Sequence, residues 1–397
     1  MRWARGAERS EKSAKARNFL GGVILLSVVA CRPAATREQA SASASASAPA
    51  PASASPSASP SPSASASAPA TAPVLPTAEA LAAPFRATHA RGFVAVTALD
   101  GSGVPHRVVT ALPLGDTLPT QAVPIASFTK LWTAVAALRL VAAHRLALTD
   151  RVADVLPSLA SRPWSDSTLA ELMSHTSRVP EFDEASGYFS RRDVSFADPV
   201  ATLEKHLSRT QTEKRGVFKY KNAEYALVGA MVATRAALAF PEVLAKEVFA
   251  PAKMTRSGIL IGGVPADVDA RSLGTVRAQN FFAAGAGTST PEDLLAFFEA
   301  LAGDALLDEP SRHLLFDGVK SRGYGALGCW AYPFATGDAG AEPALLVERQ
   351  GALGGMKLFA AFLPASRRAV VAWSSTSVAF DHPYLGRGVG HALATLL

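Results

Sequence analysis

Strand-like apolar runs lie near both ends of the folded part of the chain, and apolar residues at helical spacing fill the middle. The run Gly92–Leu99 alternates and stops at Asp100-Gly101, a pair typical of tight turns. The strand-like runs cover residues 92–99, 107–111, 344–347, 356–363 and 369–373. The helical runs cover residues 131–146, 199–207, 224–237, 241–249 and 291–302. This order predicts an α/β (α+β) fold, in which an antiparallel sheet built from both chain ends is flanked by helices and carries an inserted all-helical subdomain.

The first thirty residues have the pattern of an export signal. A basic segment ends at Arg17, and the apolar run that follows, 19–30, is too short to span a bilayer comfortably. The run ends in Val28-Val-Ala-Cys31, which resembles the lipobox of bacterial lipoproteins. We therefore predict a lipoprotein signal peptide over residues 1–30 and lipidation of Cys31. The alternative is an uncleaved short anchor that contains a cysteine by chance.

A tether follows the lipobox. From Ala40 to Pro73 every residue is Ala, Ser or Pro except Thr71. Recurring prolines and alternating serines prevent a helix, so we predict a disordered tether over residues 31–76 and a folded domain over residues 77–397. The lipid and the tether together predict a membrane partner and a place in the cell envelope. Arg32, where an aspartate would signal inner-membrane retention, favours the outer membrane.

Charge and cysteine usage exclude several classes of function. The net charge is +6, but eight of the 39 basic residues and only three of the 33 acidic ones lie in the first 40 positions. The remainder is nearly neutral, which predicts no nucleic-acid partner. With Cys31 lipidated, Cys329 is the one remaining thiol, so no intramolecular disulfide is expected. No metal-ligand motif and no dinucleotide fingerprint is present, and no metal or cofactor is predicted.

Ser127-Phe-Thr-Lys130 is the first candidate for chemistry. It opens an apolar helical run, so Ser127 and Lys130 lie one turn apart on the same face. A lysine at the edge of an apolar core loses hydration, its pKa falls, and it can accept the serine proton. The alternative interpretation is a helix-capping serine beside a surface lysine.

Tyr220-Lys-Asn222 is the second candidate, placed just before the helix expected from Glu224. A tyrosine carries protons usefully only if nearby cations lower its pKa, and the Asn222 amide could orient a lysine or a substrate carbonyl. A loop tyrosine and a helix-capping asparagine are the alternative.

Together these motifs resemble the serine β-lactamase and penicillin-binding-protein superfamily, in particular its class C-like branch of carboxypeptidases, D-amino-acid peptidases and esterases. Leu172-Met-Ser-His-Thr-Ser177 is similar to the Leu-Leu-x-His-Thr-Ser-Gly segment of that branch. Further blocks similar to the branch follow in its order at residues 144–157, 218–229, 284–293 and 324–330. The resemblance implies catalytic roles for Ser127, Lys130 and Tyr220, and a substrate-binding role for Asn222.

The third motif of the branch is altered. Where it has Lys-Thr-Gly or His-x-Gly, this chain has Arg349-Gln350-Gly351. Arg349 keeps a positive charge, which could lower the tyrosine pKa or hold a substrate carboxylate by two hydrogen bonds. The resemblance also implies that Gly351 lets the strand approach closely and that the oxyanion hole consists of the Ser127 and Ala352 backbone N–H groups.

The resemblance implies an envelope-tethered serine hydrolase that forms an acyl-enzyme on small esters, amides or D-amino-acid peptides. Because Lys-Thr-Gly is absent, esterase or peptidase activity is expected over true β-lactamase activity. The alternative is a degenerate hydrolase that binds a cell-wall peptide or a protein partner without turnover. For the hydrolase, the expected partner is a small-molecule or peptide substrate, with cell-wall peptides among the candidates. His175 is expected to form structural hydrogen bonds.

Overall fold

The computed structural model describes residues 72–336 and 342–397, all within the unit Ala66–Leu397. The predicted signal peptide, Cys31 and the tether up to residue 71 lie outside the described residues.

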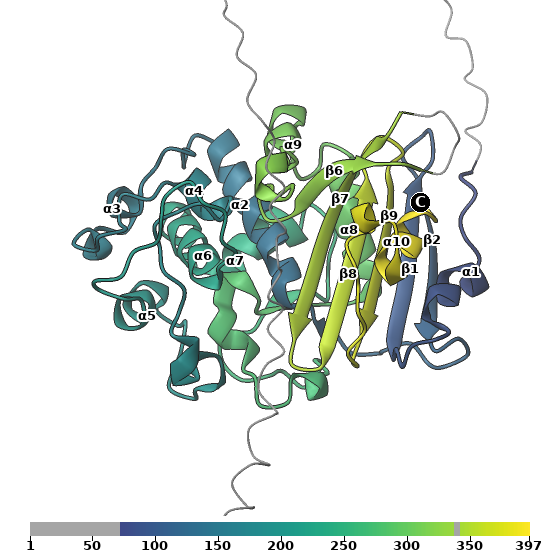
Figure 1. The fold of residues 1–397 in the computed structure, drawn as a ribbon, viewed down its shortest axis with the longest axis horizontal. Helices are drawn as coiled ribbons and strands as arrows, with labels where there is room; N and C mark the ends of the chain where they lie inside the picture. The colour runs from purple at the N-terminus through teal and green to yellow at the C-terminus, as the bar shows by residue number, and fades with distance from the viewer. Residues whose placement is uncertain (1–71, 337–341) are drawn as a thin grey trace, which may run out of the picture. The chain divides into compact units, whose positions relative to one another are not determined.

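A six-stranded antiparallel sheet joins the two ends of the domain, as Figure 1 shows. Its order is β2-β1-β9-β8-β7-β6. The strands are β1 (Gly92–Leu99), β2 (Pro105–Leu112), β6 (Trp330–Phe334), β7 (Ala344–Leu353), β8 (Met356–Leu363) and β9 (Arg368–Ser374). β1 pairs with β9 in the register Phe93↔Trp373, so the first strand of the sheet lies against the last. The predicted fold class is confirmed.

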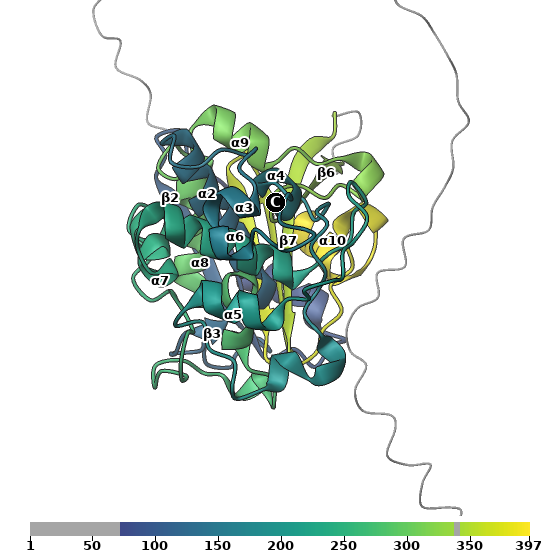
Figure 2. The same cartoon turned by 90° about the vertical axis from the view of Figure 1, so that its left-hand side faces the viewer.

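Helices cover both faces of this sheet. One face packs against α8 (Pro291–Ala302) and the helical lobe, and the other against α1 (Ala78–Ala82) and α10 (Gly388–Ala394). The lobe lies beside the sheet in Figure 1 and faces the viewer in Figure 2. It contains α3 (Val152–Val155), α4 (Leu169–Met173), α5 (Pro199–His206), α6 (Asn222–Ala236) and α7 (Phe240–Leu244).

Between the lobe and the sheet lies α2 (Thr129–Ala142), which is buried along nearly all of its length. It packs against α6 and against α9 (Glu309–Leu315). β3 (Val123–Pro124) comes before α2 in the chain and belongs to a three-stranded sheet with β5 (Gly287–Ser289) and β4 (Gly258–Ile259), in the order β3-β5-β4. The Ile125 N–H donates to the Gly287 carbonyl at 2.9 Å and so anchors the turn that leads into α2.

Several element boundaries differ from the sequence prediction. α2 ends at Ala142 rather than residue 146, because His144 adopts a left-handed backbone, φ 53°, and the chain turns there. β6 was not predicted, since Pro333 argues against a strand, but proline is tolerated here because β6 is an edge strand. β7, expected over 344–347, continues to Leu353, so all of Arg349-Gln350-Gly351 lies within a strand.

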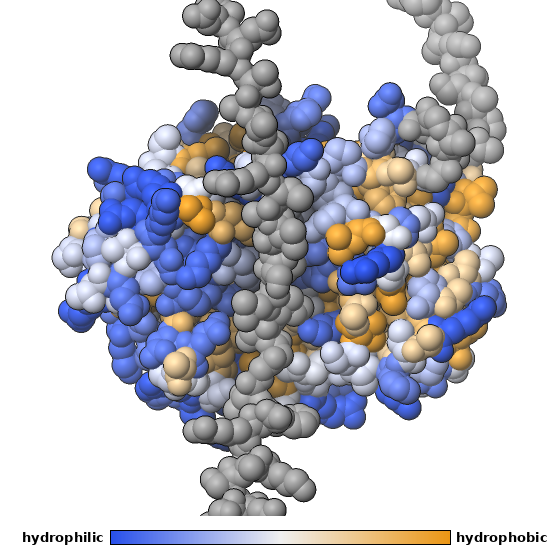
Figure 3. All heavy atoms as spheres, in the orientation of Figure 1, coloured by the Kyte–Doolittle hydropathy of each residue, from blue (hydrophilic) through white to orange (hydrophobic). Residues whose placement is uncertain are grey.

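The face of the molecule drawn in Figure 3 is mostly hydrophilic over the helical lobe, while hydrophobic residues gather over the sheet near α10. Within residues 72–336 and 342–397, no single helix has the length and apolar content to cross a bilayer. α6 and the segment Phe240–Phe249 pass that test only as a pair bent by 79°.

Candidate active site

Ser127 lies in a single 3₁₀ turn, Ala126–Phe128, that runs directly into α2. Ala126 adopts a left-handed backbone, φ 47°, which is uncommon for a residue with a side chain. The turn leaves Ser127 partly exposed, whereas its neighbours Ala126 and Phe128 are buried. Ser127 makes no capping hydrogen bond to the helix. A helix-capping role is therefore excluded in this structure.

Lys130 lies one turn further along and is fully buried. Its ammonium donates to the Asn222 amide oxygen at 2.8 Å, to the Ala284 carbonyl at 2.8 Å and to the Ser127 hydroxyl at 3.3 Å. Burial lowers the pKa of Lys130, because the charged form loses its hydration. Lys130 is therefore not a surface lysine. Its bonds to Asn222 and Ala284 hold the nitrogen within hydrogen-bonding distance of Ser127.

Tyr220 lies between two cations. Lys130 Nζ is 4.7 Å from the centroid of its ring, and Arg349 Nη2 donates to its hydroxyl at 2.8 Å. Burial alone would raise the pKa of the Tyr220 phenol, but the Arg349 and Lys130 charges outweigh burial and lower this pKa to about 8. The sequence interpretation required nearby cations to lower the pKa of Tyr220, and Lys130 and Arg349 are those cations.

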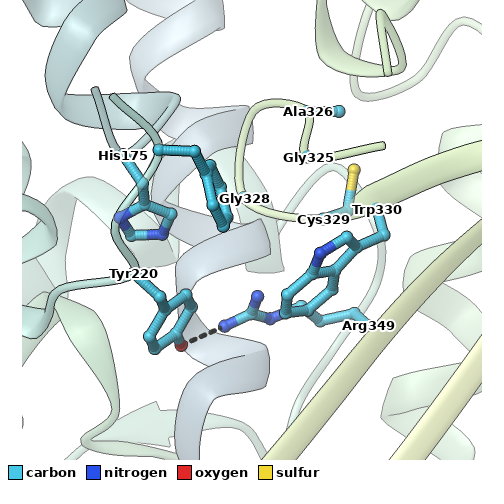
Figure 4. A pocket seen from close by; sticks show the side chains of 9 residues that line it. His175, Tyr220, Gly325, Ala326, Gly328, Cys329, Trp330 and Arg349 are labelled. Atoms are coloured by element: carbon cyan, nitrogen blue, oxygen red, sulfur yellow. Dashed lines mark hydrogen bonds between the residues drawn. The ribbon is translucent and has the colours of Figure 1, made fainter. Parts of the chain in front are cut away.

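Arg349 reaches the site from β7, as Figure 4 shows. Its Nε donates to the Ser127 carbonyl at 2.7 Å, and its guanidinium lies 5.2 Å from the Trp330 ring centroid. Nε and Nη2 each donate one bond to the protein, which leaves the Nη1 hydrogens and the second Nη2 hydrogen for a substrate carboxylate. The buried guanidinium also narrows the cleft, and the pocket lined by His175, Tyr220 and Trp330 has a cavity volume of about 0 Å³ for a water-sized sphere.

Gly351 brings β7 against the nucleophile turn. A Cβ atom at this position would lie 2.4 Å from the Ile125 carbonyl oxygen, so only glycine permits the approach. Ala352 follows at an exposed position on the same strand. The structure therefore brings the third motif beside Ser127, and the oxyanion-hole assignment of the Ser127 and Ala352 N–H groups remains a prediction.

A buried network lies behind Tyr220. His175 was expected to form structural hydrogen bonds, but its partner Glu224 and the neighbouring Lys221 were not predicted. His175 Nδ1 lies 2.6 Å from Glu224 Oε2, and Lys221 Nζ lies 3.0 Å from Glu224 Oε1. The His175 ring packs on the Tyr220 ring, with 4.6 Å between centroids. Burial, reinforced by the Lys130 charge, lowers the pKa of His175 well below its usual value, so the imidazole is neutral. The i,i+3 spacing of Lys221 and Glu224 at a helix start was the one sequence signal for this network.

Glu181 was missed as well. Its carboxylate accepts from the backbone N–H groups of Asn222 at 2.5 Å and Ala223 at 3.0 Å, at the first turn of α6. It comes from a loop about 40 residues earlier, and no local pattern marks it. The helix begins at Asn222 rather than Glu224, and its first N–H groups bond to Glu181 instead of to a capping side chain. In the part of the chain that the structure describes, no three His, Cys, Asp or Glu side chains are grouped as metal ligands would be.

Solved structures share this fold. A penicillin-binding protein from Bacillus halodurans matches with a TM-score of 0.61 and 21% identity, over 80% of this chain and 98% of that one. A D-stereospecific amidohydrolase from Streptomyces sp. matches with a TM-score of 0.60 and 18% identity, over 76% and 95%. The D-amino acid amidase of Ochrobactrum anthropi SV3, complexed with L-phenylalanine amide, matches with a TM-score of 0.59 and 18% identity, over 77% and 92%.

Sequence comparison gives a more specific result. No protein with a curated function gives a significant match. The sequence model of the β-lactamase family, however, matches residues 79–394, which span nearly all of the described residues. The chain therefore belongs to the β-lactamase family, whose fold is that of the serine hydrolases it resembles.

Proposed function

We propose that this protein is a serine hydrolase that forms an acyl-enzyme on Ser127 and acts on small esters, amides or D-amino-acid peptides. One observation carries the proposal. A fully buried Lys130 ammonium lies 3.3 Å from the Ser127 hydroxyl, beside a tyrosine whose pKa is lowered to about 8. Burial of a lysine without a direct carboxylate partner destabilises its charged form. In a chain of the β-lactamase family, a lysine of this kind can serve as the base that takes the serine proton.

In the proposed reaction, Lys130 first loses a proton to become the neutral amine, which burial favours. Ser127 Oγ then attacks the substrate carbonyl carbon while its proton moves to the Lys130 nitrogen. The bond from that carbon to the leaving group breaks, and the leaving group takes a proton from the Tyr220 hydroxyl. Water then attacks the acyl-enzyme and gives up its proton to the same pair, so Ser127 is regenerated and an acid is released. General acid–base catalysis of this kind contributes about 10²- to 10⁴-fold to a rate.

The expected substrate range follows from the altered third motif. Arg349 supplies the cation at the Tyr220 hydroxyl, so the proton-transfer machinery does not need the usual lysine or histidine. Its bulk fills the pocket beside Tyr220 and Trp330, which favours small acyl groups. Two of the solved relatives are named as amidases or amidohydrolases with D stereospecificity, which supports amides among the substrates.

A fluorophosphonate probe and a fluorescent penicillin test the proposal. We expect labelling of the wild-type protein that disappears in Ser127→Ala, with hydrolysis of a neutral aryl ester exceeding that of nitrocefin. A D-Ala-D-Ala peptide in the same panel measures peptidase activity. A folded wild-type protein that no acyl or phosphonyl probe labels would instead favour the alternative, a protein that binds a wall peptide without turnover.

We further propose that lipid on Cys31 holds the domain in the cell envelope, because a lipobox-like sequence precedes the Ala/Ser/Pro tether. Metabolic labelling with a palmitate analogue and membrane fractionation test this step. The expected result is a labelled membrane protein that becomes unlabelled in Cys31→Ala. Wild-type protein without the label would contradict lipidation and leave the hydrolase proposal standing.

A further inference from the structure

Glu181 lies next to the proposed catalytic groups without being one of them. Its two carboxylate oxygens face four N–H donors: the Asn222 and Ala223 backbone groups, its neighbour Phe182 N at 2.9 Å, and the Asn222 side-chain nitrogen at 3.4 Å. The side chain is half-buried at the start of α6. Burial raises the pKa of Glu181, and the N–H groups of Asn222, Phe182 and Ala223 oppose this rise. Each of these donors needs an acceptor, and the two carboxylate oxygens supply it at the positive end of the helix.

Hydrogen bonds link Glu181 to Asn222 and Asn222 to Lys130, and the donor and acceptor of each bond are fixed by the two end groups. An ionised carboxylate only accepts, and an ammonium only donates. Asn222 lies between the two, with its amide nitrogen facing Glu181 and its oxygen 2.8 Å from Lys130 Nζ. If the amide turned over, its oxygen would face a carboxylate and its NH₂ group would face an ammonium, and both contacts would be repulsive.

We propose that Glu181 is a positioning residue of the serine site, which fixes the Asn222 amide so that its oxygen holds Lys130 against Ser127. The inference rests on the hydrolase proposed above and goes beyond it, since Glu181 touches none of the reacting atoms. The backbone bonds to Asn222 and Ala223 place the first turn of α6, and the longer side-chain contact sets the orientation of the amide.

Glu181 also acts through its charge. The titratable groups that face Lys130 are Tyr220, Tyr225, Arg349, His175 and, through Asn222, Glu181. The negative charge on Glu181 favours the Lys130 ammonium and opposes the fall that burial causes in the Lys130 pKa. Removal of this charge therefore lets the Lys130–Tyr220 pair lose its proton at a lower pH, so the acidic limb of a rate profile moves to lower pH.

Glu181→Gln is the sharpest test, because the side chain keeps its size. One amide NH₂ group must then face the N–H donors of α6. We expect kcat to fall about tenfold to a hundredfold with KM little changed, in line with the cost of misplacing a catalytic group. The acidic limb of kcat/KM should move to lower pH, and Glu181→Asp should recover part of kcat because an acceptor-only group is retained.

Asp293→Asn is the matched control. Asp293 is a buried carboxylate that accepts from Thr255 N at 3.2 Å and Arg256 N at 2.7 Å, and it takes no part in the hydrogen bonds around Ser127. Both variants should lower Tm, but only Glu181→Gln should change kcat and the pH profile. A Glu181→Gln protein with a lower Tm and wild-type kinetics would show that Glu181 only stabilises the start of α6, and it would overturn the proposal. A higher KM with unchanged kcat would make it a substrate contact and would also overturn the proposal.

A crystal structure of Glu181→Gln supplies a readout that does not depend on turnover. We expect the contact between the Asn222 oxygen and Lys130 Nζ to be lost or reversed, and an intact contact at 2.8 Å would refute the positioning role. Fluorophosphonate labelling separates the two proposals. A labelled wild-type protein with an equally labelled Glu181→Gln variant refutes the role of Glu181 alone, whereas an unlabelled wild-type protein refutes the hydrolase itself.

Discussion

The Tyr220 hydroxyl accepts a hydrogen bond from Arg349 at 2.8 Å, across 129 residues of sequence. The same guanidinium donates to the Ser127 carbonyl, so one side chain on β7 ties the tyrosine loop to the nucleophile turn. Its charge is also the largest influence that lowers the Tyr220 pKa. A residue that departs from the usual third motif therefore performs two tasks for the site.

Arg349→Ala tests which of these tasks matters to catalysis. The Arg349 charge also lowers the pKa of Lys130, so without the guanidinium this pKa rises and less of the neutral amine is available to accept the Ser127 proton. The rate at neutral pH should then fall about tenfold for each unit of that rise. We expect equal losses for a neutral aryl ester and for a carboxylate-bearing substrate, with the rate profile moved to higher pH. A loss confined to the carboxylate-bearing substrate would support the anchoring role that the sequence also suggested.

Lys130→Met tests the proton acceptor. Methionine fills the buried space without a charge, so the protein should stay folded while ester hydrolysis falls by about 10²- to 10⁴-fold. Steady-state kinetics and circular dichroism give the two readouts. Lys246→Met, an exposed position on the segment after α7, is the control and should keep wild-type rates. Unchanged hydrolysis in Lys130→Met would remove Lys130 from the mechanism.

Glu224→Gln tests the buried network behind Tyr220. Burial, opposed by Lys221, raises the Glu224 pKa in the folded protein from 4.5 to about 8. The folded state then binds more protons than the unfolded state between about pH 4.5 and 8, so the free energy of unfolding should decrease as pH rises through this range. Urea denaturation at several pH values measures this slope. We expect Glu224→Gln to flatten it and the exposed control Glu309→Gln to leave it unchanged.

Gly351→Ala tests the close approach of β7 to the nucleophile turn. The new methyl group would overlap the Ile125 carbonyl, and relief of that overlap requires a shift of the turn that carries Ser127. Overpacking of this kind costs about 1–3 kcal/mol of stability, and a shift of the turn should lower kcat as well. Gly263→Ala, with open space around it, is the control for thermal denaturation and kinetics. Wild-type kcat in Gly351→Ala would show that the turn tolerates displacement.

Local patterns predicted much of the fold. The limits of α8 were predicted correctly, because Thr290 caps the helix and Pro291 occupies its first turn. β1 and β8 also match their predicted ranges, since alternation and turn residues mark both ends of each. β6 was missed because it contains Pro333, and the small sheet of β3, β4 and β5 was missed because strands of two or three residues carry too little periodicity to be recognised.

The candidate site, like the fold, could be predicted from the sequence only in part. The sequence determined the order of the motifs and the one-turn spacing of Ser127 and Lys130, because both depend on neighbours along the chain. Only the tertiary structure decided that Lys130 is buried, that Arg349 bonds to Tyr220 and that Glu181 holds the start of α6. Burial and charge act through space, so the pKa values and the orientation of these groups depend on segments that the chain brings together from 40 to more than 200 residues apart.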